Sequence, residues 1–221
     1  MDINEITQLT QLTQQEITRR GDPSNPKGEE GAIMLSRMNN SHAELTQWAL
    51  SHISIEKDGK ALDIGCGGGA ALKKLSSVMP RGKLFGIDHS EVAVRSATEN
   101  NFADVASGKM KVIRASVSDM PFDSGYFDLI ITVESFYFWR SPIEDLAQVR
   151  RVLKKGGAFL LVLDVYQKDG LSQETKENVK QYDMFLPTPE QLEDMLAKAG
   201  FSNVCIHTKQ GTDWICAVAM I

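Results

Sequence analysis

An apolar run that ends in an acid and then breaks into glycines is the feature that most constrains this chain. It reads ALDIGCGGG, residues 61–69. Such a run predicts a buried parallel strand that turns sharply into a helix, with a backbone bare enough for a ligand to touch. A second apolar run, KLFGIDHS at 83–90, ends in Asp88. Glycines that admit a cofactor, followed by a carboxylate that accepts hydrogen bonds from ribose hydroxyls, are typical of a nucleotide site. The pair does not decide which nucleotide.

Length and composition favour one cytoplasmic domain. The chain has 221 residues, enough for one sizeable core, and 42% of them are hydrophobic. No apolar run approaches the ~20 residues that cross a bilayer. The N-terminus lacks the basic start and apolar stretch of a secretory signal. We therefore expect a cytoplasmic protein with no membrane partner.

Charge and cysteine spacing exclude other classes. The net charge is −5 and the pI about 5.4, and the basic residues are scattered, so nucleic acid is disfavoured as a partner. Cys66, Cys205 and Cys216 have no metal-binding spacing, and we predict no metal. Cys205 and Cys216 stand in apolar stretches and are predicted to be core residues.

Strand and helix patterns alternate from residue 60 onward. Nearly continuous apolar runs predict seven strands, at 61–65, 83–88, 109–116, 126–135, 156–165, 203–210 and 213–221. Helical patterns are found at 69–79, 90–105, 142–155 and 187–200. Apolar strands separated by helices indicate a parallel sheet covered on both faces. Two or three residues separate the last two strands, which requires a hairpin and an antiparallel last strand. We predict an α/β fold, a Rossmann-like three-layer sandwich with a seven-stranded, mostly parallel sheet.

The N-terminal part reads differently. Residues 1–20 have a loosely helical spacing, and residues 21–31 contain prolines and glycines typical of a loop. A helix is predicted to begin at Ser41, with Glu44 completing a capping box. We therefore divide the chain into a helical and loop cap, 1–40, and a main domain, 41–221. Whether residues 1–20 cap the same chain or form dimer contacts is open, so monomer and homodimer are both compatible.

Four motifs in order carry a resemblance to a known family. They are DIGCGGG at 63–69, FGIDHS at 85–90, SDMPFDSGYFDLI at 118–130 and RRVLKKGGAFLLV at 150–162. With them, residues 43–221 resemble a class I S-adenosylmethionine-dependent methyltransferase of the small-molecule type (methyltransferase domain 11/25). The resemblance implies S-adenosylmethionine as methyl donor, S-adenosylhomocysteine as product, a seven-stranded sheet, and an O, N, S or C nucleophile of a small molecule as acceptor.

Two alternatives remain. The fingerprint of an NAD-dependent oxidoreductase can be laid on Gly65, Gly67 and Ala70, with Asp88 as its ribose acid. Asp63 before the turn and the two downstream motifs favour the methyltransferase. A catalytically silent cofactor-binding module of the same fold is the second alternative. The identity of the acceptor is beyond the sequence.

The resemblance also implies roles for individual residues. Asp63 would organise the ammonium of the cofactor, Asp88 the ribose, and His89 and the Val117 amide the adenine. Ser116 stands where relatives have an acid that accepts a hydrogen bond from the adenine amino group. That contact is therefore expected to be weaker here, or to be made by Ser118 or Asp119. The predicted cofactor-binding set is Asp63, Gly65, Cys66, Gly67, Gly69, Asp88, His89, Ser116, Val117 and Glu134.

The acceptor side is predicted from two segments. Residues 134–142, ESFYFWRSP, follow the fourth strand at the lip of the crevice where ligands bind. Tyr137 and Trp139 are assigned to the acceptor, Phe136 and Phe138 to covering the sheet. In the N-terminal part, His42 is the histidine whose position suits a general base. His42 and Tyr137 are therefore the catalytic candidates.

Overall fold

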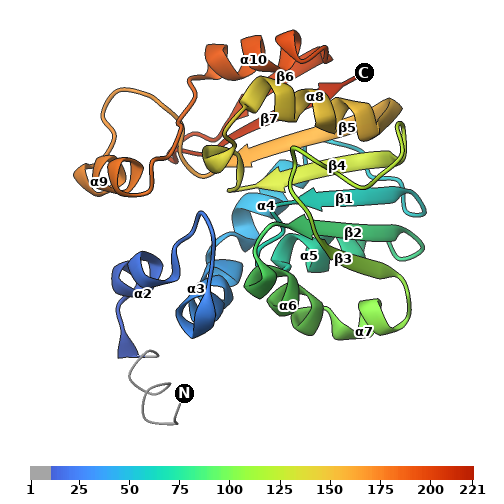
Figure 1. Cartoon of the computed structure of the whole chain (residues 1–221). Coiled ribbons are helices and arrows are strands. Elements are labelled where there is room, and N and C mark those ends of the chain that lie inside the picture. Colours follow the sequence, from blue (N-terminus) through green and yellow to red (C-terminus); the bar gives the residue numbers. More distant parts are fainter. Residues whose placement is uncertain (1–10) are drawn as a thin grey trace.

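Seven strands form one mixed sheet in a computed structural model that describes residues 11–221, with the side chains of 40 and 41 left aside. The strand order is β3-β2-β1-β4-β5-β7-β6 (Figure 1). The strands are β1 (Lys60–Ile64), β2 (Lys83–Asp88), β3 (Met110–Arg114), β4 (Phe127–Val133), β5 (Leu153–Leu163), β6 (Ser202–Thr208) and β7 (Ile215–Met220). Strands β1 to β5 pair in parallel, and β7 is antiparallel to both β5 and β6. The predicted fold class is confirmed.

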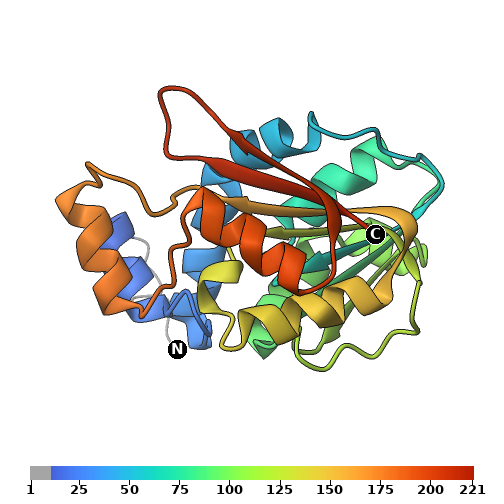
Figure 2. The ribbon, with the colours of Figure 1, turned by 90° about the horizontal axis from the view of Figure 1, so that it is seen from above.

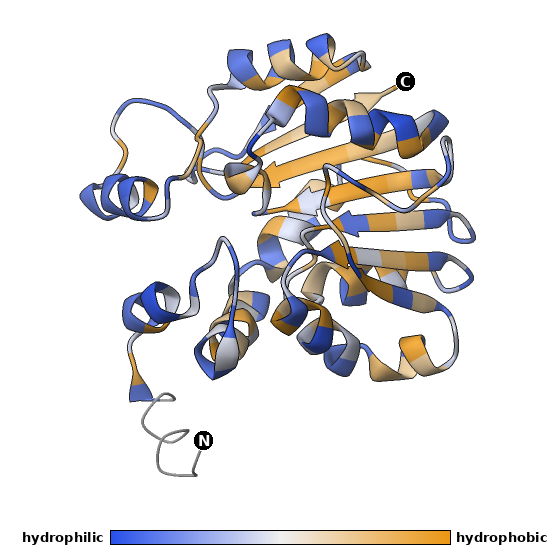
Figure 3. Ribbon diagram, viewed as in Figure 1, coloured by the Kyte–Doolittle hydropathy of each residue, from blue (hydrophilic) through white to orange (hydrophobic). Residues whose placement is uncertain are grey.

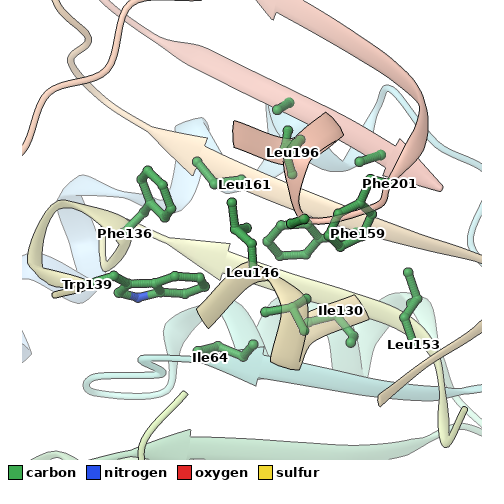
Figure 4. Packing of buried hydrophobic residues seen from close by; sticks show 14 of the residues in the cluster. Ile64, Ile130, Phe136, Trp139, Leu146, Leu153, Phe159, Leu161, Leu196 and Phe201 are labelled. Carbon is green, nitrogen blue, oxygen red and sulfur yellow. The ribbon is translucent and has the colours of Figure 1, made fainter. Parts of the chain in front are cut away.

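The sheet separates two hydrophobic cores because successive strand residues point to opposite faces. In β5, Phe159 and Leu161 belong to one core, whereas Leu160 and Val162 belong to the other. Helices α8 (Pro142–Val152) and α10 (Pro189–Lys198) cover the first face, and α4 (Ala43–Leu50) and α5 (Ala70–Val78) cover the second (Figure 2). Figure 4 shows the first core, and Figure 3 shows apolar strands between helices with polar outer faces.

Three elements differ from the predicted ranges. Helix α8 ends at Val152, and Lys154 lies in β5, where its Nζ contacts Asp128 Oδ1 at 2.6 Å. The predicted helix 90–105 divides into α6 (Glu91–Asn100) and α7 (Phe102–Ala106), because the Asn101 side chain bonds the carbonyls of Gly69 and Ala97. The loop between β6 and β7 is longer than predicted, spanning 209–214.

A polar helix and one cysteine also depart from the predictions. Helix α9 (Gln173–Gln181) was not predicted because it contains no buried residue and so has no apolar stripe. Its start is stabilised by Ser172, whose side chain accepts from the Thr175 amide. Cys216 is buried as predicted, but Cys205 is exposed: it lies on edge strand β6, where its neighbours Val204 and Ile206 are the residues that pack against the first core. Among the described residues, no helix has the length and apolar character that crossing a membrane requires.

The N-terminal helices lie at the carboxyl edge of the parallel strands (Figure 1). Helix α2 spans Gln14–Gly21 and α3 spans Gly28–Ser41, so α3 begins inside the predicted loop. The predicted start at Ser41 is wrong: α4 begins at Ala43, and His42 holds the cap position without a side-chain cap. Packing of Ile17, Met34 and Leu35 against Ala93 attaches α2 and α3 to α6. The first half of the helical pattern predicted for 1–20 lies outside the described residues, and the domain boundary at 40/41 stays a prediction.

Candidate active site

The glycine turn joins β1 to α5. Gly65, Gly67 and Gly69 have φ of 69°, 50° and 81°, a region that residues with a Cβ rarely adopt. The amides of Gly65 and Cys66 donate to the Ile87 carbonyl at 2.9 and 3.0 Å, which ties the turn to β2. A Cβ on Gly65 would overlap the Ser135 side chain after β4. The turn therefore needs glycine for both its backbone conformation and its close packing.

Asp88 connects the end of β2 to that turn. Its Oδ2 accepts from the Gly67 amide at 3.0 Å and its Oδ1 from the Ser90 amide at 2.9 Å. The side chain is buried, and burial raises the pKa of Asp88 against the lowering effect of these two amides. The carboxylate is thus held in one orientation at the edge of a cavity.

Asp63 is a buried carboxyl group with an unpaired oxygen. The residue is 1% exposed, and its Oδ2 has no hydrogen-bond partner among the described residues. Burial, with a smaller effect of the Asp88 charge, raises the pKa of Asp63 to about 8. Buried polar atoms in folded proteins are nearly always hydrogen-bonded. An orphaned carboxyl oxygen at a cavity wall fits a ligand that brings a cationic donor, such as the ammonium of an amino acid.

A first cavity of about 620 Å³ opens over the turn, within the range of small-molecule and cofactor sites. Of the predicted cofactor residues, all but Gly69 line it. They are Asp63, Gly65, Cys66, Gly67, Asp88, His89, Ser116, Val117 and Glu134. The Ser116 hydroxyl accepts from the Ser118 amide at 3.2 Å, and Ser118 also lines the cavity, whereas Asp119 does not. The cap contributes Asn39, whose amide donates to the Gly68 carbonyl at 3.2 Å.

A second cavity, of about 390 Å³, adjoins the first. Its walls come from α2, α3, the turn after β4, the segment after β5, and α9. Five residues line both cavities, namely Pro23, Met38, His42, Glu134 and Phe138. The two spaces therefore meet where His42 and Glu134 lie.

Tyr137 is the centre of a buried polar cluster at this junction. It lines the second cavity, is 2% exposed, and lies in the 3₁₀ turn η1 (Phe136–Phe138). Its hydroxyl lies 3.0 Å from Asp164 Oδ1 and 3.3 Å from Glu134 Oε1, and it accepts from the Val165 amide at 3.1 Å. Burial, reinforced by the charges of Glu134 and Asp164, raises the pKa of Tyr137 well above its usual range. The phenol is thus a neutral donor.

Glu134 is held by the same cluster in a strained backbone conformation. Its φ is +60°, unusual for a residue with a Cβ, and its Oε1 accepts from the Asp164 amide at 2.5 Å. Burial, and next the charge of Asp164, raise the pKa of Glu134 well above its usual range. Burial lowers the pKa of His42, against a smaller opposite effect of Asp164. The ligand atoms of His42, Glu134 and Asp164 all lie within 4.8 Å of one another.

The sequence reasoning missed Asp164. It follows β5 and lies 30 residues from Glu134 along the chain, so no local spacing connects them. An acid at the carboxyl end of the fifth strand was the available signal. Of the aromatic row, Phe136 is in the core, whereas Phe138 lines both cavities and Trp139 the first. Phe138 therefore does more than cover the sheet.

Comparisons with known proteins show which proteins this chain resembles. A family model for a methyltransferase domain matches residues 62–161. The uncharacterized methyltransferase YdaC of Bacillus subtilis is 24% identical over 132 residues, 60% of this chain and 71% of that protein. The tRNA U34 carboxymethyltransferase of Mannheimia succiniciproducens is 27% identical over 185 residues, and the match covers 75% of this chain but 54% of that enzyme.

A solved structure extends the likeness to the whole fold. The SAM-dependent methyltransferase from Aquifex aeolicus superposes with a TM-score of 0.69 at 19% identity, covering 96% of this chain and 100% of that one. None of these proteins supports the NAD-dependent alternative. The motifs, the strand order and the family model agree, and together they support a class I S-adenosylmethionine-dependent methyltransferase.

Proposed function

We propose that this protein transfers the methyl group of S-adenosylmethionine to a small molecule bound in the second cavity. The observation that carries the proposal is the junction of the two cavities at His42 and Glu134. A volume of about 390 Å³ suits a metabolite. Because methyl transfer requires the acceptor atom in line with the methyl–sulfur bond, a donor cavity that opens directly onto an acceptor cavity supports this function.

On the donor side, this chain's residues bind and orient. We assign Asp63 to the cofactor ammonium, which would be the partner that the Asp63 carboxyl group lacks, and Asp88 to the ribose hydroxyls. His89, Ser116 and Val117 would flank the adenine. When bound, the cofactor supplies a methyl group made electrophilic by a sulfonium. The glycine turn and the cap residues above it would exclude water from that group.

On the acceptor side, His42 is the proposed proton acceptor. Burial lowers the pKa of His42, so the imidazole is neutral at neutral pH and has a free lone pair. Among the described residues no group forms a hydrogen bond with the His42 ring, so a bound acceptor could form a hydrogen bond with the ring directly. Tyr137 acts as a positioning residue, because its hydroxyl holds Glu134 and Asp164.

A nucleic-acid acceptor is the competing possibility, since one relative is named a tRNA-modifying enzyme. Two observations favour the small molecule. The net charge is −5, and the described residues that line the second cavity include no lysine or arginine. Phosphate backbones bind to the opposite charge.

Calorimetry followed by a turnover assay tests the proposal. We expect S-adenosylhomocysteine to bind and NAD not to bind; a protein that binds NAD but not S-adenosylhomocysteine would refute the assignment. Labelled S-adenosylmethionine is then incubated with a metabolite extract of low molecular mass and, separately, with total tRNA. Label in the metabolite fraction is expected. Label in tRNA alone would overturn the small-molecule acceptor, and label in neither would identify a silent cofactor-binding module.

A further inference from the structure

The second cavity has a one-sided charge. Among the described residues, its wall contains the carboxylates of Glu134, Asp164 and Asp213, and no lysine or arginine. Asp213 is neutralised, because Lys168 Nζ lies 2.5 Å from its Oδ1. Within the described part of the chain, neither Glu134 nor Asp164 forms an ion pair with a lysine or arginine. The carboxyl groups of Glu134 and Asp164 therefore have no lysine or arginine partner among the described residues.

These two carboxyl groups lie at the end of the cavity next to the donor cavity. Glu134 and Asp164 are linked by a hydrogen bond of 2.5 Å through the Asp164 amide, and the Tyr137 hydroxyl lies beside both carboxylates. Two carboxylates that share a poorly solvated site disfavour double ionisation unless a cation joins them. Glu134 also holds a strained φ of +60° that brings its side chain to this place. A positively charged ligand would relieve the repulsion.

The rest of the wall indicates an organic cation. Aromatic rings of Tyr137, Phe138 and Tyr182 and the side chains of Val179 and Met184 line the cavity. Aromatic faces attract organic cations, and apolar side chains cover hydrocarbon. A bare divalent ion would use His42, Glu134 and Asp164, whose ligand atoms are close enough, but would leave most of about 390 Å³ without a role.

We propose that the acceptor is an organic amine, bound as its ammonium ion by Glu134 and Asp164 with its organic part against Phe138 and Tyr182. This inference rests on the proposed function of the site. The ammonium gives one proton to neutral His42. The freed nitrogen lone pair then bonds to the methyl carbon, while the methyl–sulfur bond breaks and its electron pair stays on sulfur. The positive charge moves from sulfur to the methylated nitrogen, so charge and atoms balance.

Matched ligands test the proposal by binding, without turnover. The probes are two triplets: phenethylamine, 2-phenylethanol and 3-phenylpropionate, and 3-methylbutylamine, 3-methylbutanol and 4-methylpentanoate. Calorimetry is done on the full chain saturated with S-adenosylhomocysteine. We expect at least one amine to bind tenfold more tightly than its alcohol, and neither carboxylate to bind. An alcohol that binds as well as its amine, or failure of both amines to bind, would overturn the proposal.

Variants show whether the named carboxylates are responsible. Asp164→Asn keeps an acceptor oxygen for Tyr137 and should weaken amine binding at least tenfold, with the Kd of S-adenosylhomocysteine unchanged within twofold. Glu134→Gln is the second variant, in case the first fails to fold. Asp194→Asn removes the same charge from an exposed site, 57% accessible, and should leave amine binding unchanged. Unaltered amine binding in Asp164→Asn would count against the proposal.

Two further results separate competing explanations. Amine binding that disappears with EDTA and returns with Mg²⁺ or Mn²⁺ would overturn the proposal in favour of a metal held by His42, Glu134 and Asp164. A wild-type chain that does not bind S-adenosylhomocysteine would refute the proposed function itself. A chain that binds S-adenosylhomocysteine but prefers no amine refutes only this inference.

Discussion

Replacing Asp63 with asparagine should stabilise the ligand-free protein, and increasingly so as the pH rises. In the folded chain burial and the Asp88 charge raise the pKa of Asp63 from 3.8 to about 8. A carboxyl whose pKa is higher in the folded state binds its proton more tightly there. Its contribution to stability is therefore fully present below pH 3.8 and is lost as the pH rises towards 8.

The size of the effect follows from the shift. Each pH unit inside this window lowers the free energy of unfolding by about 1.4 kcal/mol relative to a group that does not titrate. By pH 7 the accumulated cost of Asp63 is about 4 kcal/mol, and between pH 5 and pH 7 it changes by about 3 kcal/mol. Asparagine has nearly the same shape and no charge, so Asp63→Asn escapes this cost.

Urea unfolding of both proteins without ligand, at pH 5, 6 and 7, measures the difference. The stability gap between variant and wild type should widen by about 3 kcal/mol over this range. A gap that stays constant within about 1 kcal/mol would refute the reasoning. The exposed change Asp194→Asn should show no such widening. Saturating S-adenosylhomocysteine should stabilise the wild type much more than Asp63→Asn, because the variant lacks the proposed partner of the ammonium.

Three other substitutions test the site. Gly65→Ala should lower the free energy of unfolding by at least about 2 kcal/mol and abolish S-adenosylhomocysteine binding, because a Cβ there overlaps a side chain. The control Gly125→Ala places its Cβ in open space and should lower that free energy by only about 1 kcal/mol, through backbone strain. Thermal unfolding of the two variants measures the difference. Tyr137→Phe should lower the free energy of unfolding by about 1–3 kcal/mol and slow methyl transfer, with S-adenosylhomocysteine affinity within threefold of wild type by calorimetry. Asp88→Asn should weaken S-adenosylhomocysteine at least tenfold, and the 84%-exposed Glu91→Gln should not; equal affinities would remove Asp88 from the site.

The parts of the fold that could be predicted are those with a local pattern. Strands buried on both faces must be apolar along their length, and helices between them need an apolar stripe. Each such element can therefore be recognised from a pattern of about ten residues. Helix α9 has no buried residue, which is why its sequence resembles a loop. The sequence at the start of β5, from Leu153, resembles a helix end because lysines are common there. In the structure Lys154 forms an ion pair with Asp128 and lies in the strand.

The residues of the proposed donor side could also be predicted from the sequence. Asp63, the glycines and Asp88 lie at the ends of adjacent parallel strands, and parallel pairing brings those ends to one edge of the sheet without further information. A glycine that must adopt positive φ, and an acid directly after a buried strand, are constraints that a single strand–turn–helix unit imposes on its own residues.

The arrangement of the proposed acceptor side depends on the tertiary structure. His42 comes from the junction of α3 and α4, Glu134 from the end of β4, and Asp164 from the end of β5, yet their ligand atoms lie within 4.8 Å. No short-range pattern encodes such a meeting, because it depends on how the N-terminal helices pack across the sheet edge. The sequence by itself therefore determined the sheet and the glycine turn proposed to bind the methyl donor, which arise from local periodicity and backbone conformation. Only the packed chain determined the second cavity, since its charge and shape come from residues up to 199 positions apart.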